Sequence, residues 1–163
     1  MSAKKILLVD DDNDFISAIA AMLNANGYET RIANTAVEGY LVAQGYNPDL
    51  FILDVNMETD SAGFDLNKNL RSNNLFKTKP IIMLTGIETT AATNQIVDMY
   101  HEMAGMEGFD NSKVMKVMNA DGTVSVDYKT EEGKKYYLLL DSFISKPVDS
   151  ANLIKEIKRF LKD

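Results

Sequence analysis

The chain has 163 residues, of which 45% are hydrophobic, and this size and composition suit one domain with one core. Its formal net charge of −7 disfavours binding to DNA or anionic lipid, because no basic surplus can displace counterions from phosphates. The absence of cysteine excludes disulfides, thiolate metal sites and a cysteine nucleophile. No apolar run is long enough for a signal peptide or a membrane span, so we expect a cytoplasmic location.

The first half of the chain alternates short apolar runs with segments of helical periodicity. Strands are predicted over residues 6–9, 28–33, 50–53 and 81–84, and helices from Phe15 to Gly27, over 35–44 and over 64–70. The runs at 6–9, 50–53 and 81–84 are apolar throughout, which is typical of parallel strands covered on both faces. Because strands and helices alternate, we expect a parallel sheet with helices on both faces.

The second half departs from this pattern. Residues 89–103 predict a fourth helix from an apolar stripe at helical spacing. Asp121-Gly122 lies between two strand-like runs and indicates a hairpin, and Glu132-Gly133 suggests a further turn. We therefore expect a β-rich antiparallel insertion over about residues 105–137, within a single domain that spans residues 1–163.

Polar side chains follow the ends of four predicted strands. Asp10-Asp11 follows the first strand, Asp54 the third and Thr85 the fourth. Lys146 follows the last strand, at residues 143–145, and precedes a C-terminal amphipathic helix. Because the loops beyond the carboxyl ends of parallel strands converge, these groups should meet at one edge of the sheet. Three carboxylates there repel one another, so a cation such as Mg²⁺, which prefers oxygen ligands, is the expected occupant.

In this order the residues resemble a known family. Asp-Asp after the first strand, Pro-Asp-Leu-x-x-Leu-Asp ending at Asp54, Thr85-Gly86, and Lys146-Pro147 are similar to the motifs of response-regulator receiver domains of two-component systems. The resemblance covers residues 4–86 and 138–163. It implies a flavodoxin-like α/β fold with a doubly wound five-stranded parallel sheet, here carrying the β-rich insertion between the fourth helix and the fifth strand.

The resemblance implies a role for each acidic residue at this edge. Asp54 is the expected phosphoacceptor, and Mg²⁺ is the expected cofactor. The expected metal ligands are the side chains of Asp10, Asp11 and Asp54 and the backbone carbonyl of Asn56. Such a site suits phosphoryl transfer, which needs an in-line nucleophile and positive charge near the transferred oxygens rather than elaborate covalent chemistry.

Other residues are implied to bind the phosphoryl group, namely Thr85, Gly86 and Lys146. The Lys146 ammonium would neutralise charge and the Thr85 hydroxyl would donate a hydrogen bond, so both join Asp54 as catalytic residues. Thr85 and Phe143 are the expected switch, because charge added at Asp54 draws the hydroxyl inward and leaves room for the aromatic ring. We expect self-catalysed phosphorylation and dephosphorylation of the aspartate only, so the chain is not expected to be an enzyme.

The implied partners are proteins. A sensor histidine kinase or a phosphotransfer protein is the expected phosphodonor, and a downstream protein is the expected target, with neither nucleic acid nor membrane in direct contact. The interval of 61 residues between Thr85 and Lys146 is far longer than one helix with short loops requires. Our hypothesis is that the insertion at 105–137 forms a partner-specific platform or replaces a dimer surface, so a homodimer is a further candidate assembly.

Two alternatives remain open on the sequence alone. Asp10 and Asp12 have the Asp-x-Asp spacing of haloacid-dehalogenase-like phosphohydrolases, in which Asp10 would be the nucleophile. Against this, no late acidic motif follows Lys146, and Asp54 would have no role. The second alternative is a receiver-like binding module that is no longer phosphorylated and binds Mg²⁺ weakly or not at all.

Overall fold

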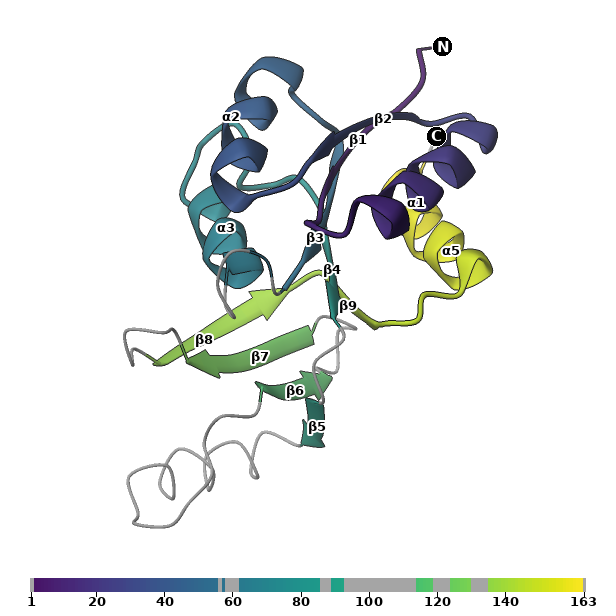
Figure 1. The fold of residues 1–163 in the computed structure, drawn as a ribbon. Helices are drawn as coiled ribbons and strands as arrows, with labels where there is room; N and C mark the ends of the chain where they lie inside the picture. The colour runs from purple at the N-terminus through teal and green to yellow at the C-terminus, as the bar shows by residue number, and fades with distance from the viewer. Residues whose placement is uncertain are drawn as a thin grey trace, which may run out of the picture.

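A parallel sheet forms the centre of the computed structural model (Figure 1). Its strands are β1 (Lys5–Val9), β2 (Glu29–Ala33), β3 (Leu50–Asp54), β4 (Ile81–Thr85) and β9 (Ser142–Ser145). They lie in the order β2-β1-β3-β4-β9, and every neighbouring pair is parallel. The structure describes residues 2–55, 57, 62–85, 89–92, 114–118, 124–129 and 135–162.

Helices cover both faces of this sheet. They are α1 (Asn13–Ala25), α2 (Ala36–Tyr46), α3 (Ala62–Arg71) and α5 (Ser150–Phe160). Helices α1 and α5 lie on one face, and α2 and α3 lie on the other (Figure 1). The predicted α/β fold with a parallel sheet is therefore confirmed. Among the helices of the described ranges, none has both the length and the apolar character needed to cross a membrane.

The central strands are apolar throughout because their side chains enter two cores. In β1, Leu7 and Val9 join the core beneath α2 and α3, whereas Ile6 and Leu8 join the core beneath α1 and α5. All four of these side chains are 0% exposed. This alternation is the period of two that a strand imposes on its side chains. Packing on both faces holds the strands firmly, and it thereby fixes where the residues that follow each strand lie.

A second sheet follows β4 in the chain and ends directly before β9 (Figure 1). It contains β5 (Thr89–Ala92), β6 (Val114–Met118), β7 (Val124–Lys129) and β8 (Lys135–Leu140) in that order. The pairs β6–β7 and β7–β8 are antiparallel, whereas β5 and β6 are parallel. The Asp121-Gly122 and Glu132-Gly133 turns predicted between these strands lie outside the described residues.

Strand β5 lies where the sequence predicts the start of a helix. The helix predicted over residues 89–103 is wrong at its beginning, because Thr89–Ala92 form strand β5 and pair with β6. Residues 93–103 lie outside the described part of the chain. The two threonines at 89 and 90 are β-branched and favour extended backbone, which outweighs a helical stripe that lies further along. The second sheet therefore begins at Thr89 rather than near residue 105.

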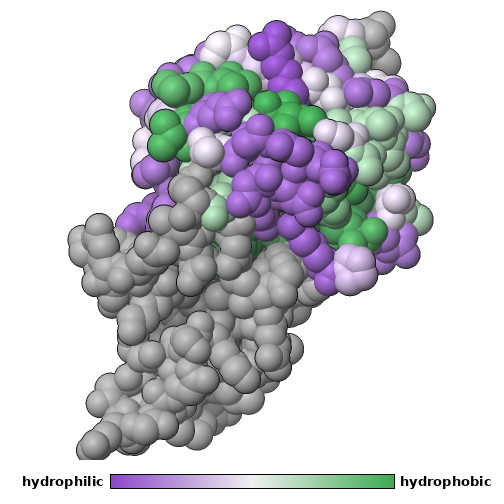
Figure 2. Space-filling view, viewed as in Figure 1, coloured by the Kyte–Doolittle hydropathy of each residue, from purple (hydrophilic) through white to green (hydrophobic). Residues whose placement is uncertain are grey.

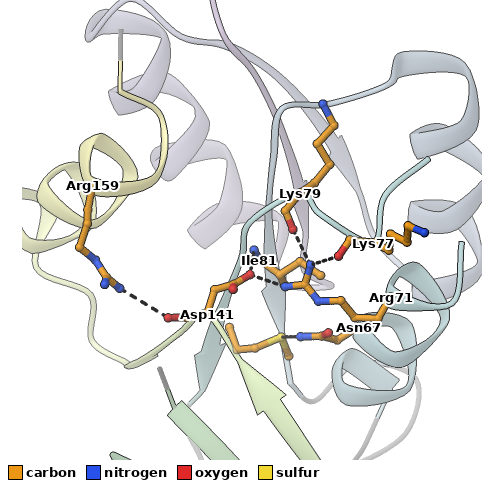
Figure 3. A network of polar contacts seen from close by, with 8 residues as sticks. Asn67, Arg71, Lys77, Lys79, Ile81, Asp141 and Arg159 are labelled. Atoms are coloured by element: carbon orange, nitrogen blue, oxygen red, sulfur yellow. Dashed lines mark hydrogen bonds and ion pairs between the residues drawn. The ribbon is translucent and has the colours of Figure 1, made fainter. Parts of the chain in front are cut away.

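A polar network ties the segment that leaves the second sheet to the main sheet (Figure 3). The Arg71 guanidinium, at the end of α3, donates to the carbonyls of Lys77 and Lys79 at 3.1 and 2.6 Å and pairs with the Asp141 carboxylate. Asp141 lies between β8 and β9, and its Oδ2 also accepts from the N–H of Ile81 at 2.8 Å. The network therefore fastens together the starting ends of β4 and β9.

The outer surface of α2 carries two exposed large apolar side chains, Val37 and Leu41. Figure 2 shows hydrophobic surface in the region of this helix beside largely hydrophilic surface. A groove of about 360 Å³ extends from these side chains to α3 and is lined also by Tyr40 and Leu66. Among the described residues, none that directly follows a strand of the main sheet lines this groove, so it is separate from the carboxyl ends of those strands.

Candidate functional site

Three carboxylates gather at the carboxyl ends of β1 and β3. Oxygen atoms of Asp10, Asp11 and Asp54 all lie within 4.8 Å of one another. Asp10 is 0% exposed and Asp54 is 6% exposed, whereas Asp11 faces solvent. Two buried acids and one exposed acid thus form a cluster, called here the acidic pocket, in which Asp11 is the member exposed to solvent.

The register of the sheet brings the two buried acids together. Val9 of β1 pairs with Leu53 of β3, and Asp10 and Asp54 are the next residues along the chain, so they lie side by side. The loop after β1 is also held by hydrogen bonds. The backbone N–H of Asp10 donates to the carbonyl of Ala33 at 3.0 Å. The Asp10 carboxylate accepts from the N–H of Asp12 at 2.9 Å. These bonds fix the buried carboxylate before any ligand arrives.

Lys146 brings a positive charge to the same pocket from the end of β9. Its Nζ lies 3.1 Å from Oδ2 of Asp10 and 3.3 Å from Oδ1 of Asp54. The peptide bond between Lys146 and Pro147 is cis. Residues separated by 136 positions in the sequence are therefore hydrogen-bonded at one edge of the sheet.

An aromatic ring that the sequence interpretation did not place in the site completes the surroundings of this ammonium. The Nζ of Lys146 lies 4.6 Å from the centroid of the Phe15 ring. In the sequence, Phe15 marks only the predicted start of the helix that the structure shows as α1. Its only sequence signal is its position in the first turn after the acidic loop, and that signal does not reveal a lysine 131 positions away.

The electrostatics of the pocket favour a proton or a cation at Asp54. Burial, followed by the nearby Asp10 carboxylate, raises the pKa of Asp54 from 3.8 to about 6, although Lys146 acts in the opposite direction. For Lys146, burial lowers the pKa, but the hydrogen bonds and charges of Asp10 and Asp54 outweigh burial, so its pKa is raised. Lys146 therefore carries its positive charge at neutral pH. That one charge does not offset the effects of burial and of Asp10 on Asp54, because the pKa of Asp54 is still raised.

The donor set fits a hard divalent cation. Among the described residues, three carboxylates converge here and offer oxygen ligands, and the Lys146 ammonium pairs with two of them, those of Asp10 and Asp54. Mg²⁺ is bound in proteins by one or two carboxylates together with waters and phosphate oxygens. The residues present are therefore compatible with the expected magnesium site.

The structure locates the remaining predicted site residues only in part. Thr85 is the last residue of β4 and pairs in register with Ser145, the residue before Lys146. Phe143 pairs with Met83 in the interior of the β4–β9 ladder. Only the backbones of Thr85 and Phe143 are described, and Asn56 and Gly86 lie outside the described residues. The predicted roles of these four residues stay predictions.

The comparison with protein families gives a match that covers most of the chain. Residues 6–109 match the response regulator receiver domain model. The photosynthetic apparatus regulatory protein RegA of Rhodobacter capsulatus is 32% identical over 98 residues, which cover 60% of this chain and 52% of RegA. The phosphate regulon transcriptional regulatory protein PhoB of Pseudomonas aeruginosa is 36% identical over 85 residues, which cover 52% of this chain and 37% of PhoB. The chain thus spans about half or less of the length of these relatives.

Solved structures agree in fold. The chemotaxis response regulator CheY4 of Vibrio cholerae aligns with a TM-score of 0.61 and 24% identity, over 98% of this chain and 100% of CheY4. A response regulator of Chloroflexus aurantiacus aligns with a TM-score of 0.62 and 23% identity, over 99% and 100% of the two chains. With the family match over residues 6–109, the chain belongs to the response regulator receiver domain family.

Proposed function

We propose that the chain accepts a phosphoryl group on Asp54 from a phosphohistidine donor, with Mg²⁺ bound, and that the modified state changes a protein-contact surface. The observation that carries this proposal is the buried Asp54 carboxylate, which lies beside Asp10 and Asp11 and within 3.3 Å of the Lys146 ammonium. In the transfer, an Asp54 oxygen bonds to phosphorus as the bond from phosphorus to the histidine nitrogen breaks. The nitrogen keeps the electron pair of that bond.

The chain's own residues prepare Asp54 for this role. The carboxylate is held at the carboxyl end of β3, where it is fixed by the strand and retains 6% exposure. Lys146 places positive charge next to the position where a phosphoryl group on Asp54 would stand. This charge stabilises developing negative charge on the transferred oxygens.

We propose that the side chains of Asp10, Asp11 and Asp54 and the backbone carbonyl of Asn56 hold the magnesium ion. A bound Mg²⁺ supplies the positive charge that offsets the phosphoryl oxygens and the crowded carboxylates. We assign Thr85 and Gly86 to phosphoryl binding, and Thr85 with Phe143 to the switch. The activity proposed is limited to the phosphorylation and dephosphorylation of this one aspartate.

The proposed partners follow from this chemistry. A histidine kinase or phosphotransfer protein in the cytoplasm would deliver the phosphoryl group, and a protein target would read the modified state. We propose that the second sheet, with the insertion at 105–137, forms the target platform or a dimer surface. A variant that lacks residues 106–135 should lose its partner or its self-association and keep phosphorylation at Asp54, whereas loss of both would contradict this division.

The rival hydrolase is less well supported by the site geometry. Asp12, the second acid of the Asp-x-Asp pair, caps α1 by accepting from the N–H of Phe15 at 3.1 Å. Asp54, which that mechanism does not use, lies buried beside Asp10 instead. A helix cap already satisfies Asp12, so the geometry gives it no part in the acid cluster.

The direct test is phosphorylation of the intact chain by acetyl phosphate, followed by intact mass, with and without Mg²⁺. We expect one phosphoryl adduct that requires Mg²⁺ and that Asp54→Ala abolishes. Asp14→Asn, which removes an exposed acid of α1, is the matched control and should be modified normally. An adduct that persists in Asp54→Ala and maps to Asp10 would favour the hydrolase, and no adduct in the unaltered chain would favour the binding module.

A further inference from the structure

Phe15 lies where it can hold the ammonium of Lys146 in the site. Its ring centroid is 4.6 Å from Nζ of Lys146, and the same nitrogen is hydrogen-bonded to Asp10 and near Asp54. We propose that Phe15 is a positioning residue for Lys146, whose ring face keeps the ammonium directed at the Asp54 carboxylate by a cation–π interaction. This inference rests on the proposed function, since it concerns how the same site binds a phosphoryl group.

A lysine at this position needs such a support. Its ammonium is a point charge on a flexible four-carbon chain with many rotamers, and the Lys146 side chain is 23% exposed. The two carboxylates that now bind it are also proposed magnesium ligands. A cation bound among them competes for their negative charge and weakens their hold on Lys146. The neutral ring face of Phe15 is not a magnesium ligand, so its attraction for the ammonium persists when the metal binds.

The fold fixes the ring in this place by the same loop that positions the acids. The Asp12 carboxylate, hydrogen-bonded to the N–H of Phe15, sets the first turn of α1 directly after Asp10. The ring is partly buried and packs against the core beneath α1 and α5. Its orientation is therefore held by packing on one side, while the other side is available to the ammonium.

The alternative explanation is a purely structural role, in which Phe15 only fills space at the edge of this core. The two explanations differ in which replacements they tolerate. Phe15→Leu keeps apolar volume and removes the aromatic face, whereas Phe15→Tyr keeps both. A structural role predicts similar behaviour for Leu and Tyr, but a cation–π role predicts that only Tyr restores the native behaviour.

The first experiment measures the rate of acetyl phosphate modification of the full chain with saturating Mg²⁺. We expect Phe15→Leu to slow phosphorylation about fivefold, and Phe15→Tyr to restore it to within about twofold. In a Lys146→Met background the same Phe15→Leu change should have no further effect, because the ammonium it positions is gone. Equal slowing by Phe15→Leu in both backgrounds, or no slowing in either, would overturn the proposal.

The second experiment does not depend on phosphorylation. Lysine side chains are acylated briefly in the presence of Mg²⁺, and modification of Lys146 is measured by peptide mass relative to the exposed Lys155. Phe15→Leu should raise the relative modification of Lys146 about threefold or more, and Phe15→Tyr should not. If the unaltered chain accepts no phosphoryl group, the proposed function fails, and this labelling still decides whether Phe15 holds Lys146. Equal labelling in all three chains refutes the inference, whatever the outcome of the phosphorylation assay.

Discussion

Gly63 lies directly against the backbone of Asp54. A Cβ on Gly63 would stand 1.9 Å from the carbonyl oxygen of Asp54 and 2.7 Å from the Cα of Val55. The N–H of Gly63 also donates to the carbonyl of Val55 at 2.9 Å. Because the atoms met are backbone rather than a flexible side chain, any larger residue must displace either α3 or the end of β3. The first turn of α3 therefore depends on glycine to approach the proposed phosphoacceptor.

We expect Gly63→Ala to destabilise the fold by about 2 kcal/mol or more, because overpacking against rigid backbone is hard to relieve. The Asp54 carboxylate should move with the strand end, so Mg²⁺ affinity and the rate of phosphorylation should fall as well. Gly45→Ala is the matched control, since no heavy atom lies within 4 Å of a Cβ there. That exposed helical position should gain about 0.5 kcal/mol from the lower entropy of alanine. Urea denaturation of both variants checks the contrast, and similar stabilities would contradict it.

The Arg71–Asp141 pair leads to a second prediction, about the junction between the two sheets. Asp141→Ala removes the acceptor for both the Arg71 guanidinium and the N–H of Ile81. Arg71 keeps its bonds to the carbonyls of Lys77 and Lys79, but the loss of the two bonds to Asp141 in a half-buried setting should cost about 1–3 kcal/mol. A double-mutant cycle with Arg71→Met should give a coupling energy of about 1 kcal/mol, measured by urea denaturation.

The control for that network is an exposed lysine of α5. Lys155 lies on the solvent side of this helix. Substitutions at exposed positions change stability little, so Lys155→Ala should cost less than about 0.5 kcal/mol. If Asp141→Ala costs no more than Lys155→Ala, the Arg71–Asp141 network does not fasten the strands.

The sequence was sufficient to place the acids and Lys146 at one edge of a parallel sheet, because that placement needs only strand periodicity and polar strand ends. It was not sufficient for contacts set by tertiary packing. The approach of Phe15 to Lys146 depends on how α1 and α5 pack on the sheet, and the pairing of Arg71 with Asp141 joins residues 70 positions apart. Neither contact leaves a local pattern in the chain.

The strand at Thr89–Ala92 shows the limit of periodicity itself. A helical stripe further along the same stretch suggested one helix, yet pairing with β6 decides the conformation at its start. Short segments are settled by their partners more than by their own propensity, because the hydrogen bonds of a strand come from another part of the chain. Gly63 is a related case: the residue is plain in the sequence, but its contact with Asp54 is not.

The raised pKa of Asp54 makes a third prediction, about pH. In the folded chain the pKa is about 6, against 3.8 for an ordinary aspartate, so between these values the folded state binds more protons than the unfolded state. The stability contributed by protonated Asp54 is present in full below about pH 4 and is lost as pH rises through about 6. Asp54→Asn cannot ionise, so it should become more stable than the unaltered chain as pH rises through this window, by on the order of 2 kcal/mol. Urea denaturation in metal-free buffer over about pH 4–8 measures the difference, and a difference that does not change with pH would contradict the raised pKa.

Mg²⁺ should reverse this behaviour, because the ion binds the ionised carboxylates and must displace the proton from Asp54 at low pH. At a fixed Mg²⁺ concentration we expect a small rise in Tm at about pH 5 and a larger rise at about pH 7.5. A ligand that binds only the folded state stabilises it more the further its concentration exceeds its dissociation constant, and competition with the proton raises that constant at low pH. Asp54→Asn should lose most of the pH dependence of this rise, because the proton that competes with the metal is absent. Lys155→Ala, at an exposed position of α5, should show the same Mg²⁺ response as the unaltered chain. A Tm rise that is equal at both pH values in the unaltered chain would mean that Mg²⁺ binds somewhere other than the pocket that contains Asp54.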